Sequence, residues 1–574
     1  MKIFNKKEKY KYPWEKYYKK EQRNITVPDI SLYEYLDKSA FGKNNSIAIN
    51  YFGVKMTFRE LLDKIDLCAK ALTSSGVREN DVVTICMPNT PEAVIMFYAV
   101  NKIGAISNLI HPLSSKEEIK ESLIATNSVF LQLVNINFDK IKDIIKETNV
   151  YKTIVISPKE SMPSLLSLGY YLTRDIKIDF TSDENFLSWN SFLERGKTYK
   201  KDITIHRTGE DDAIYLHSGG TTGTPKNIVL KNKNINSIIE QARIIFPDIG
   251  EGDSFLSILP MFHCFGLVVC IIAPLCLGST AILVPQFDAK RFDKLIKKYK
   301  PTVLAGVPTL FEALINNPYM INVDLSYVKQ VISGGDSLSV KKNEEVNNFL
   351  LKHNCKVRIK QGYGMTETSG PAAIGSFGSD KLGSFGIPLP GNRFKIVNLE
   401  TKEELAPGEV GEICISGPVI MSRYLNNEEE TNNMINVDRD GVKWVCTGDL
   451  GYMDEDGVFF YVQRLKRMLI VSGYNVYPTH LETTIDKHEA VKQCGIIGVP
   501  HPYKVQVPIA YITLNDKYEN DVETINSIEK YCEENLAKYM LPKKFIVIKE
   551  FPKTMIGKID YKELEKMYKG EKNE

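Results

Sequence analysis

The stretch "DVVTICMPNTPEAVIMFYAV", residues 81–100, contains the strand-then-helix pattern that decides the fold class. Residues 81–86 are a short apolar run typical of a buried strand, and residues 87–90 form a turn. Pro91 then begins a segment in which apolar residues recur with helical spacing. Strand-then-turn runs return later as "STAILV", "PTVLAG" and "VKQVISGG". This alternation is typical of βαβ units and predicts an α/β fold with parallel sheets.

The domain organisation is predicted from the length of the chain and from changes in the pattern of residue types along it. At 574 residues the chain is too long for a single ordinary core. From about Gly386 it turns to short strands with Gly and Pro turns, which predicts a small antiparallel β-unit at about 386–460. We therefore expect a basic N-terminal arm at 1–30, a large multi-layer N-terminal domain at 31–462, and a small α+β domain at 463–574.

Composition excludes several classes of protein. The chain is 43% hydrophobic and 25% charged with a net charge of +2, which argues against a dedicated nucleic-acid binder. Its ten cysteines are scattered without a CxxC pair, so a structural zinc site has little support. They indicate buried thiols in a reducing, cytoplasmic compartment.

Three segments bear on membrane contact. The first 23 residues carry nine Lys/Arg against three Glu without a following apolar run, which indicates a solvated arm, with loose contact to an anionic membrane as the alternative. Pro274 and Gly278 interrupt residues 267–284, "LVVCIIAPLCLGSTAILV", so we expect a buried helix, a turn and a strand rather than a membrane span. For residues 157–174, "SPKESMPSLLSLGYYLTR", we expect a buried loop and helix, with an amphipathic lip for lipid entry as the alternative.

The glycine-rich stretch "SGGTTGTPK", residues 218–226, follows the apolar run 213–216. A Walker loop needs G-x-x-x-x-G-K-[ST], and here Lys226 follows Pro225, so that type of loop is excluded. Backbone N–H groups, hydroxyls and one cation remain, and these suit a polyphosphate. A mobile surface turn is the alternative.

Six further motifs follow this stretch in order. They are "PMFHCFG" (260–266), "SGGDSLS" (333–339), "QGYGMTET" (361–368), "CTGDLGYMDEDG" (446–457), "QRLKRMLIVSGYNVYP" (463–478) and "PKTMIGKIDYKEL" (552–564). Together with "SGGTTGTPK" they closely resemble the adenylate-forming (AMP-binding) superfamily, in its acyl-CoA synthetase and fatty-acid–CoA ligase branch. Any one motif is moderately specific, while seven in order are strongly so.

The resemblance implies two half-reactions in one site. A carboxylate attacks the α-phosphorus of ATP to give an acyl-adenylate and pyrophosphate, and the thiol of coenzyme A then displaces AMP. An anion must approach a more highly charged anion, so the site needs cations at the phosphates and a dry pocket for the acyl group. The implied cofactors are ATP, Mg²⁺ and coenzyme A as co-substrate.

Roles for individual residues also come from the resemblance. The loop formed by Ser218, Gly219, Gly220, Thr221, Thr222, Gly223, Thr224 and Lys226 would hold the β- and γ-phosphates. In the motif that begins at Gln361, Tyr363 would stack on adenine, while Gly362 and Gly364 allow close backbone approach. Thr366 would bind the α-phosphate and Glu367 the Mg²⁺.

The remaining implied roles lie further along the chain. Asp449 would accept hydrogen bonds from the ribose hydroxyls, with help from Arg464. Without its neighbours, Asp449 could equally be an ordinary turn residue. Lys558 would reach the α-phosphate and carboxylate oxygens, and only its "PKTxxGK" setting separates it from a solvated lysine. His263 would gate the acyl pocket, with a satisfied core histidine as the alternative.

The segment 463–478 resembles the family's hinge, and Lys466 and Gly473 belong to it. In the family the mobile C-terminal domain rotates after adenylation, which withdraws Lys558 and brings the Gly473 loop to the pantetheine tunnel. This chain departs from the family pattern at the pivot, in the loop and after the catalytic lysine, at positions Gln463, Ile470, Val471 and Tyr561.

The substrate is a small-molecule carboxylic acid whose class is less sharply defined. Residues 260–266 hold no aspartate to pair an ammonium group, which disfavours amino acids. The apolar run 262–269, with Val307, Ser333, Gly334 and Gly335 as further walls, suits a medium- or long-chain fatty acid. An aryl or bile acid, a carrier protein as acyl acceptor and a non-catalytic nucleotide-binding role are the alternatives. Oligomeric state is not predicted.

Overall fold

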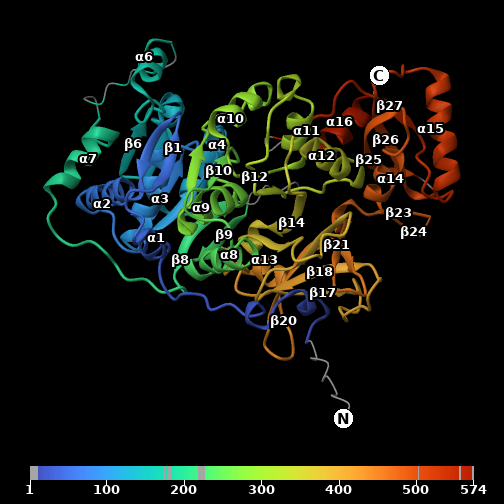
Figure 1. Ribbon diagram of the computed structural model, residues 1–574, viewed down its shortest axis with the longest axis horizontal. Coiled ribbons are helices and arrows are strands. Elements are labelled where there is room, and N and C mark those ends of the chain that lie inside the picture. Colours follow the sequence, from blue (N-terminus) through green and yellow to red (C-terminus); the bar gives the residue numbers. More distant parts are fainter. Residues whose placement is uncertain are drawn as a thin grey trace.

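The computed structural model describes residues 11–571, except 174, 177, 179, 181–182, 218–225, 473, 502 and 555–557. Its strands form sheets of 14, 8 and 5 strands, and helices lie between and around them (Figure 1). The predicted α/β class is confirmed.

The eight-stranded sheet is built around the stretch that decided the fold class. β3 (Val82–Cys86) is followed by α3 (Pro91–Lys102), which begins where the Thr90 side chain accepts a hydrogen bond from the Ala93 N–H. All twelve residues of α3 are buried. The other strands of this sheet are β4 (Ile106–Leu109), β5 (Ser128–Val134), β6 (Lys152–Ile156), β7 (Phe186–Ser188), β8 (Asp212–His217), β9 (Asn227–Lys231) and β19 (Arg423–Tyr424).

The 14-stranded sheet changes from parallel to antiparallel along its width. The parallel part contains β1 (Ile47–Tyr51), β10 (Ser254–Ser257), β11 (Thr280–Leu283), β12 (Val303–Gly306), β13 (Gln330–Ser333) and β14 (Ile359–Met365), with β2 (Val54–Thr57) antiparallel at one edge. The antiparallel part contains β15 (Gly370–Ile374), β16 (Ser384–Pro388), β17 (Arg393–Val397), β18 (Gly411–Ser416), β20 (Ile435–Val437), β21 (Lys443–Met453) and β22 (Phe459–Arg464). The short strands after residue 386 are thus continuous with the large sheet.

Helices accompany the two large sheets, and several of them share one hydrophobic core with both. They are α1 (Leu32–Ala40), α2 (Phe58–Ser74), α4 (Lys116–Ala125), α5 (Phe138–Ile141), α6 (Ser164–Thr173), α7 (Trp189–Thr198), α8 (Asn232–Ile245), α9 (Ala273–Leu277), α10 (Phe292–Tyr299), α11 (Pro308–Ile315), α12 (Val340–Lys352) and α13 (Glu428–Met434).

The apolar run 267–284 folds as predicted. A π-helix, Phe265–Ile272, continues into α9, the chain turns at Gly278 with φ of +83°, and β11 follows. Within the described part of the chain, none of the helices combines the length and the apolarity that a membrane crossing requires.

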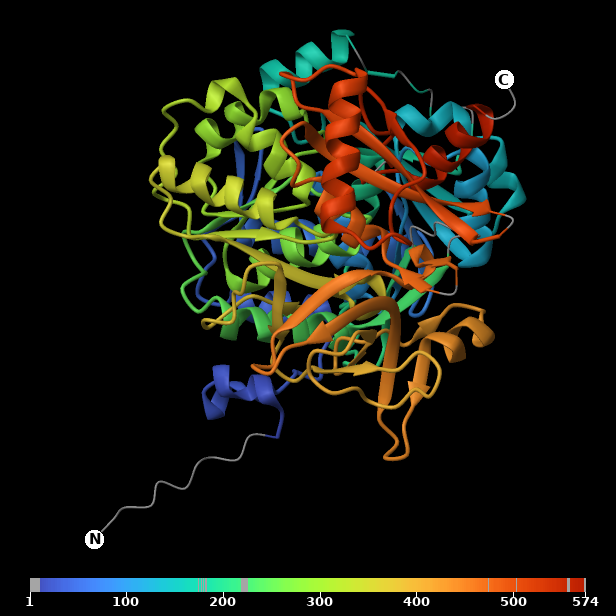
Figure 2. The same ribbon diagram turned by 90° about the vertical axis from the view of Figure 1, so that its right-hand side faces the viewer.

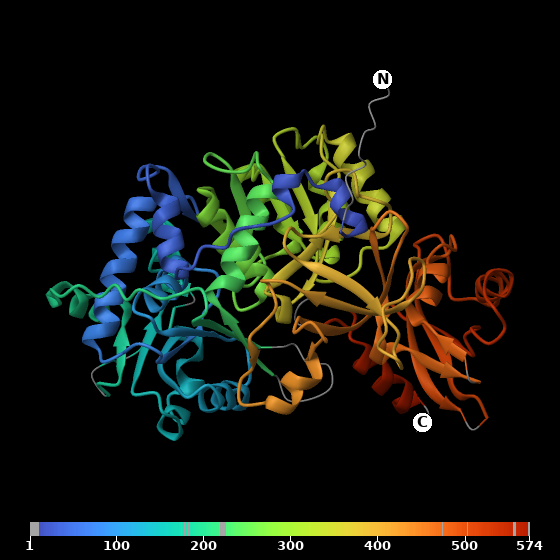
Figure 3. The same cartoon turned by 90° about the horizontal axis from the view of Figure 1, so that it is seen from below.

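The last hundred residues build a separate sheet with its own cores (Figures 2 and 3). It contains β23 (Leu469–Val471), β24 (Tyr474–Val476), β25 (Val491–His501), β26 (Val505–Leu514) and β27 (Phe545–Val547). The helices of this part are α14 (Pro478–Ile485), α15 (Val522–Asn535) and α16 (Tyr561–Glu571).

Two predictions about which segments are exposed and which are buried are wrong. Residues 11–23 are not a solvated arm, because Trp14 and Tyr18 are buried against the antiparallel strands and the Tyr18 hydroxyl donates to Pro388 O over 2.8 Å. Conversely, α6 has no buried residue, and the side chains of Leu165 and Leu172 are 86% and 71% exposed. The sequence shows that both segments contain apolar residues. It does not show whether another part of the protein packs against them.

Candidate active site

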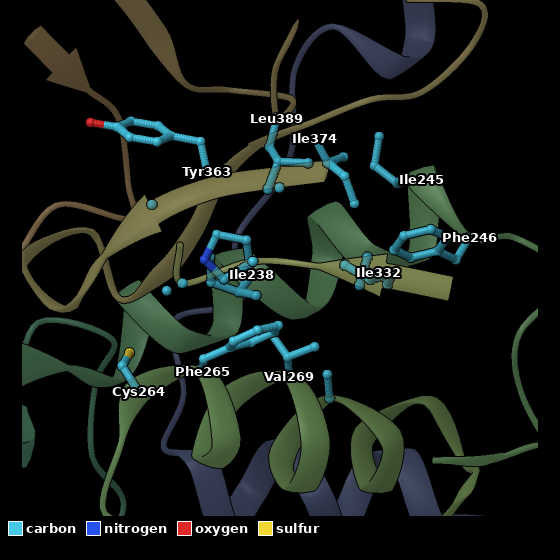
Figure 4. Close-up of a pocket in the computed structure, with 18 of the residues that line it drawn as sticks. Ile238, Ile245, Phe246, Cys264, Phe265, Val269, Ile332, Tyr363, Ile374 and Leu389 are labelled. Carbon is cyan, nitrogen blue, oxygen red and sulfur yellow. The ribbon is translucent and has the colours of Figure 1, made fainter. Parts of the chain in front are cut away.

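An apolar cavity of about 120 Å³ lies between α8, the π-helix and the strands β12 to β14 (Figure 4). Phe265 and Val269 rise from the π-helix toward Ile332, and Ile238 and Ile245 approach from α8. Seven of the predicted site residues line it: His263, Gly334, Gly335, Gly362, Tyr363, Gly364 and Thr366. The predicted wall residue Val307 is not among the lining residues, although its Cγ1 lies 3.4 Å from where a Cβ of Gly335 would be.

The mouth of the cavity lies at the carboxyl ends of parallel strands, where open α/β sheets bind their ligands. Ser333 at the end of β13 is the register partner of Gln361 in β14. Ser333 Oγ and Gln361 Oε1 are buried and have no hydrogen-bond partner among the described residues. Buried polar atoms are normally satisfied, so two unpaired atoms at one point indicate room for a polar ligand group.

Tyr363 connects this mouth to the antiparallel strands. Its ring stacks on Phe385 at 4.4 Å between centroids, and its hydroxyl donates to Asp449 Oδ2 over 2.7 Å. Arg464 Nε lies 3.0 Å from Asp449 Oδ1. Burial raises the pKa of Asp449, and the charge of Arg464 acts in the opposite direction. The three residues form one connected polar group beside the cavity.

Thr366 and Glu367 lie on a 3₁₀ turn, Thr366–Thr368, that is hydrogen-bonded to β19 and to the residue two before it. The Met421 N–H donates to Glu367 O over 2.7 Å, and the Tyr424 hydroxyl donates to Glu367 Oε1 over 2.8 Å. The Glu367 side chain is thus a buried carboxylate held by a neutral donor. Carboxylate oxygens are the ligands that Mg²⁺ prefers, so Glu367 fits the predicted metal.

Lys226 immediately precedes β9 and contacts α13. Its Nζ lies 2.5 Å from Glu430 Oε2 and 4.8 Å from the centre of the Tyr424 ring. Tyr424 therefore contacts both Lys226 and Glu367. The loop residues Ser218, Gly219, Gly220, Thr221, Thr222, Gly223 and Thr224, like Gly473, lie outside the described residues.

Lys558 lies close enough to the cavity to act on two site residues electrostatically. The pKa of His263 falls to about 4, mainly through burial and further through the charge of Lys558. The same charge lowers the pKa of Asp449 against the larger effect of burial. The Lys558 N–H donates a hydrogen bond to Thr554 Oγ1 over 3.2 Å. His263 is consequently neutral at pH 7.

The glycines of the site have packing reasons of their own. A Cβ on Gly364 would lie 1.9 Å from Gly370 O, and a Cβ on Gly334 would lie 3.2 Å from the Phe265 ring. Gly364 thus lets β14 and β15 approach across a bulge. The space beside Gly334 and Gly335, expected to be open for an acyl chain, is bordered closely by Phe265.

The hinge segment joins the two parts of the chain through buried polar groups. Gln463 is fully buried, and its side-chain amide has no partner among the described residues. Arg467 Nη2 donates to Glu482 Oε1 over 2.6 Å and its guanidinium lies 3.7 Å from the Tyr561 ring centre. Lys466 is exposed on the 3₁₀ turn between them. Tyr561, three residues after Lys558, is thus part of the packing at the hinge.

Sequence reasoning missed two groups of residues. Tyr424 and Glu430, which hold Glu367 and Lys226, lie in "YLNNEEE", where nothing in the residue types signals a site. It also missed the far wall of the cavity, which comes from the apolar face of α8 and from the first residues of β10, β12 and β13. Helical periodicity indicates that a helix such as α8 has a buried face. It does not indicate that a cavity lies against this face.

The cavity is apolar and reaches Thr366 at its mouth, beside the buried carboxylate of Glu367. The AMP-binding enzyme family model matches residues 36–425, and the model of its C-terminal domain matches residues 480–558. A long-chain-fatty-acid–CoA ligase of Bacillus subtilis is 32% identical over 553 residues, which cover 95% of this chain and 96% of the relative. A probable 4-coumarate–CoA ligase of Dictyostelium discoideum is 31% identical over 96% of this chain and 97% of its own length. The ATP-bound MatB structure from Rhodopseudomonas palustris has the same fold, with a TM-score of 0.81, 24% identity, and coverage of 94% and 99%.

The chain belongs to the AMP-binding enzyme family. The predicted enzyme class, an AMP-forming carboxylate–CoA ligase, is confirmed, with ATP and CoA as fitting co-substrates. The relatives differ in the acid that their names carry, so the comparisons leave the acid of this chain open.

Proposed function

We propose that the enzyme converts medium- and long-chain fatty acids to their CoA thioesters through an acyl-adenylate. The observation that carries this proposal is the cavity, which is lined mostly by apolar side chains. It has about 120 Å³ of free volume yet borders 27 residues, from Thr366 at the mouth to Ile249, Phe255, Leu277 and Val303 at the far end. A small cavity with that much wall suits a thin flexible chain better than a compact ring.

The depth supports the same substrate class. Gln330 and Ser333 both line the cavity and lie three residues apart on β13, which at ~3.3 Å per residue separates them by about 10 Å. An extended chain advances roughly 1.2 Å per bond, as the polypeptide backbone does, so the stretch from Ser333 at the mouth to Gln330 holds about eight bonds. An aryl acid activated at Thr366 would leave much of that length empty.

The proposed roles follow the positions of the side chains. Thr366 and Lys558 bind the α-phosphate and carboxylate oxygens, where negative charge is redistributed during adenylation. Asp449 and Arg464 hold the ribose, and Tyr363 flanks the adenine. His263, neutral at pH 7, separates the nucleotide site from the acyl cavity. Glu367 would hold Mg²⁺, which supplies charge neutralisation at the phosphates when it is bound.

The hinge lies near Gln463, between a domain at 31–462 and a smaller one at 463–574. In the proposed adenylation state Lys558 acts at the site, which is supported by the effect of its charge on the pKa of His263 and Asp449. For the second half-reaction the smaller domain rotates, and the segment with Lys466 and Gly473 serves CoA. The contact of Arg467 with Tyr561 and Glu482 fixes the lysine loop relative to the hinge.

We also propose that this enzyme is cytoplasmic and contacts membranes peripherally through α6. Four leucines of α6, namely Leu165, Leu166, Leu168 and Leu172, are between 49% and 86% exposed. Such a face suits the acyl boundary of a lipid surface, from which a fatty acid would come. Flotation with phosphatidylcholine vesicles should recover the wild type, and the Leu165→Ser/Leu172→Ser variant should stay unbound. Equal recovery of both proteins would disprove the contact.

The substrate proposal is tested by ATP-dependent pyrophosphate release with straight-chain acids from acetate to oleate, beside 4-coumarate, benzoate and a bile acid, each with and without CoA. We expect kcat/KM to rise with chain length and multiple turnover to require CoA. Highest activity with 4-coumarate would favour the aryl alternative, which the Dictyostelium relative supports. Acyl-AMP as the sole product would indicate a carrier-loading enzyme.

A further inference from the structure

Two cysteines that are distant in sequence lie side by side in the antiparallel strands. Cys414 in β18 and Cys446 in β21 are directly opposed register partners, and their Sγ atoms are 3.4 Å apart. The strand register thus brings together two cysteines that stand 32 residues apart in the sequence. Opposed Cα atoms in antiparallel strands are about 4.5 or 5.5 Å apart, and both separations lie within the span of a disulfide.

The two thiols differ in exposure and in hydrogen bonding. Cys414 is 1% exposed, whereas Cys446 is partly accessible. Asn436 Nδ2, on the neighbouring strand β20, donates to Cys446 Sγ over 2.8 Å. The hydrogen bond from the Cys414 thiol, with that of Asn436, lowers the pKa of Cys446. Because the thiolate is the nucleophile in thiol–disulfide exchange, Cys446 is the thiol that would react first.

The pair adjoins the bulge that carries Asp449. The register of β18 and β21 shifts between Glu412 and Cys414, and Gly448, two residues after Cys446, has φ of +67°. The Gly448 N–H donates to Glu412 Oε1 over 3.1 Å. The residue after this bulge is Asp449, which accepts from Tyr363. A change in the spacing of β18 and β21 at the cysteines would therefore change the position of Asp449 at the site.

We propose that Cys414 and Cys446 form a reversible disulfide that displaces the bulge and weakens nucleotide binding at Asp449. The Cys446 thiolate attacks one sulfur of a small disulfide RSSR, forms Cys446–S–S–R and releases RS⁻. Cys414 then loses its proton to solvent and attacks the Cys446 sulfur, which releases the second RS⁻. Both cysteines are oxidised and RSSR is reduced to two thiols. The effect on the nucleotide rests on the ribose role proposed for Asp449.

A metal site is the competing use of the same atoms. Glu412, Cys414 and Cys446 each place a ligand atom within 4.8 Å of the others. The two Glu412 oxygens are engaged, one by the Gly448 N–H and the other by Lys402 Nζ at 3.3 Å. A cation would have to displace these contacts, so the arrangement favours the disulfide.

The test uses the reduced full-length enzyme, hydroxyethyl disulfide as oxidant, and mass spectrometry of non-reduced peptides. We expect a Cys414–Cys446 cross-link to form before the other eight cysteines react. Cys446→Ser should give no cross-link, and Cys414→Ser should stop at a mixed disulfide on Cys446. The cross-linked enzyme should show a KM for ATP raised about tenfold, the scale of one weakened hydrogen bond to a charged group. Dithiothreitol should restore it, and the KM for the acid should not change.

Three results would overturn the proposal: no cross-link, one equivalent of zinc retained by the reduced protein after dialysis, or a cross-linked enzyme with an unchanged KM for ATP. The Asp449→Asn variant tests the proposed ribose contact separately from the disulfide. If this variant also leaves the KM for ATP unchanged, the assigned ribose contact is wrong and the nucleotide effect falls with it. The cross-link is measured independently of either.

Discussion

Replacing Ala242 by phenylalanine should shorten the range of acids that the enzyme accepts. Ala242 lies on α8 at the cavity wall and packs against the deep cluster of Ile249, Phe255, Leu277 and Val303. A benzyl group at this position would fill the deep half of the cavity and leave Thr366 and His263 at the mouth untouched. The variant therefore separates binding of the chain from chemistry at the carboxylate.

The size of the effect follows from the depth of the cavity. If about six methylene groups lose their place in the deep half, at ~0.8 kcal/mol each the loss is roughly 5 kcal/mol. That corresponds to a roughly four-thousandfold fall in kcat/KM for hexadecanoate. Hexanoate, which is too short to reach the deep cluster, should lose less than about threefold.

The assay is pyrophosphate release with even-numbered acids from hexanoate to octadecanoate, for wild type, Ala242→Phe and the control Ala242→Ser. The serine variant keeps the space open and should retain the wild-type profile. Thermal unfolding of all three proteins checks that the fold survives. An unchanged chain-length profile in a folded Ala242→Phe protein would refute the assignment of this cavity to the acyl chain.

Three further predictions concern single side chains. Lys558→Ala should lower the adenylation rate by about 10²–10³-fold, while CoA should still convert synthetic acyl-AMP to the thioester. Single-turnover assays of each half-reaction measure both rates. Equal loss in both half-reactions would contradict the proposed withdrawal of the lysine. Burial raises the pKa of Asp486 to about 7, so its ionisation destabilises the folded state as pH rises from the ordinary carboxyl range through 7. Asp486→Asn should therefore raise the free energy of unfolding by about 2–4 kcal/mol at pH 8 and not at pH 4, measured by denaturant titration, and a gain independent of pH would contradict this cause. Gly364→Ala should destabilise the protein by more than about 3 kcal/mol because its Cβ would lie 1.9 Å from Gly370 O, whereas the control Gly169→Ala has open space and should not.

Much of the fold was predictable because local patterns agree with the final structure. The run 81–86 became β3, the helix began at Pro91, and Gly278 separated helix from strand in the apolar run 267–284, while Pro274 lies within the helical part. Each of these signals depends on neighbours in sequence. The sequence also named Tyr363, Thr366 and His263, which the structure gathers around one cavity.

What could not be predicted depends on contacts between distant segments. Tyr424 reaches Glu367 across 57 residues, and Cys414 meets Cys446 across 32, through strand registers that no local pattern reveals. The burial of Trp14 required knowledge of the strand surface that receives it. The depth of the cavity likewise arises where α8 passes over β10, β12 and β13, and neither element alone signals a hollow.

A competition experiment shows whether the apolar cavity selects a fatty acid over aromatic acids. The enzyme is given equimolar hexadecanoate, 4-coumarate and benzoate with ATP, Mg²⁺ and CoA, and the thioesters are quantified by mass spectrometry at low conversion. The account predicts hexadecanoyl-CoA as the dominant product. Dominant 4-coumaroyl-CoA or benzoyl-CoA would contradict it.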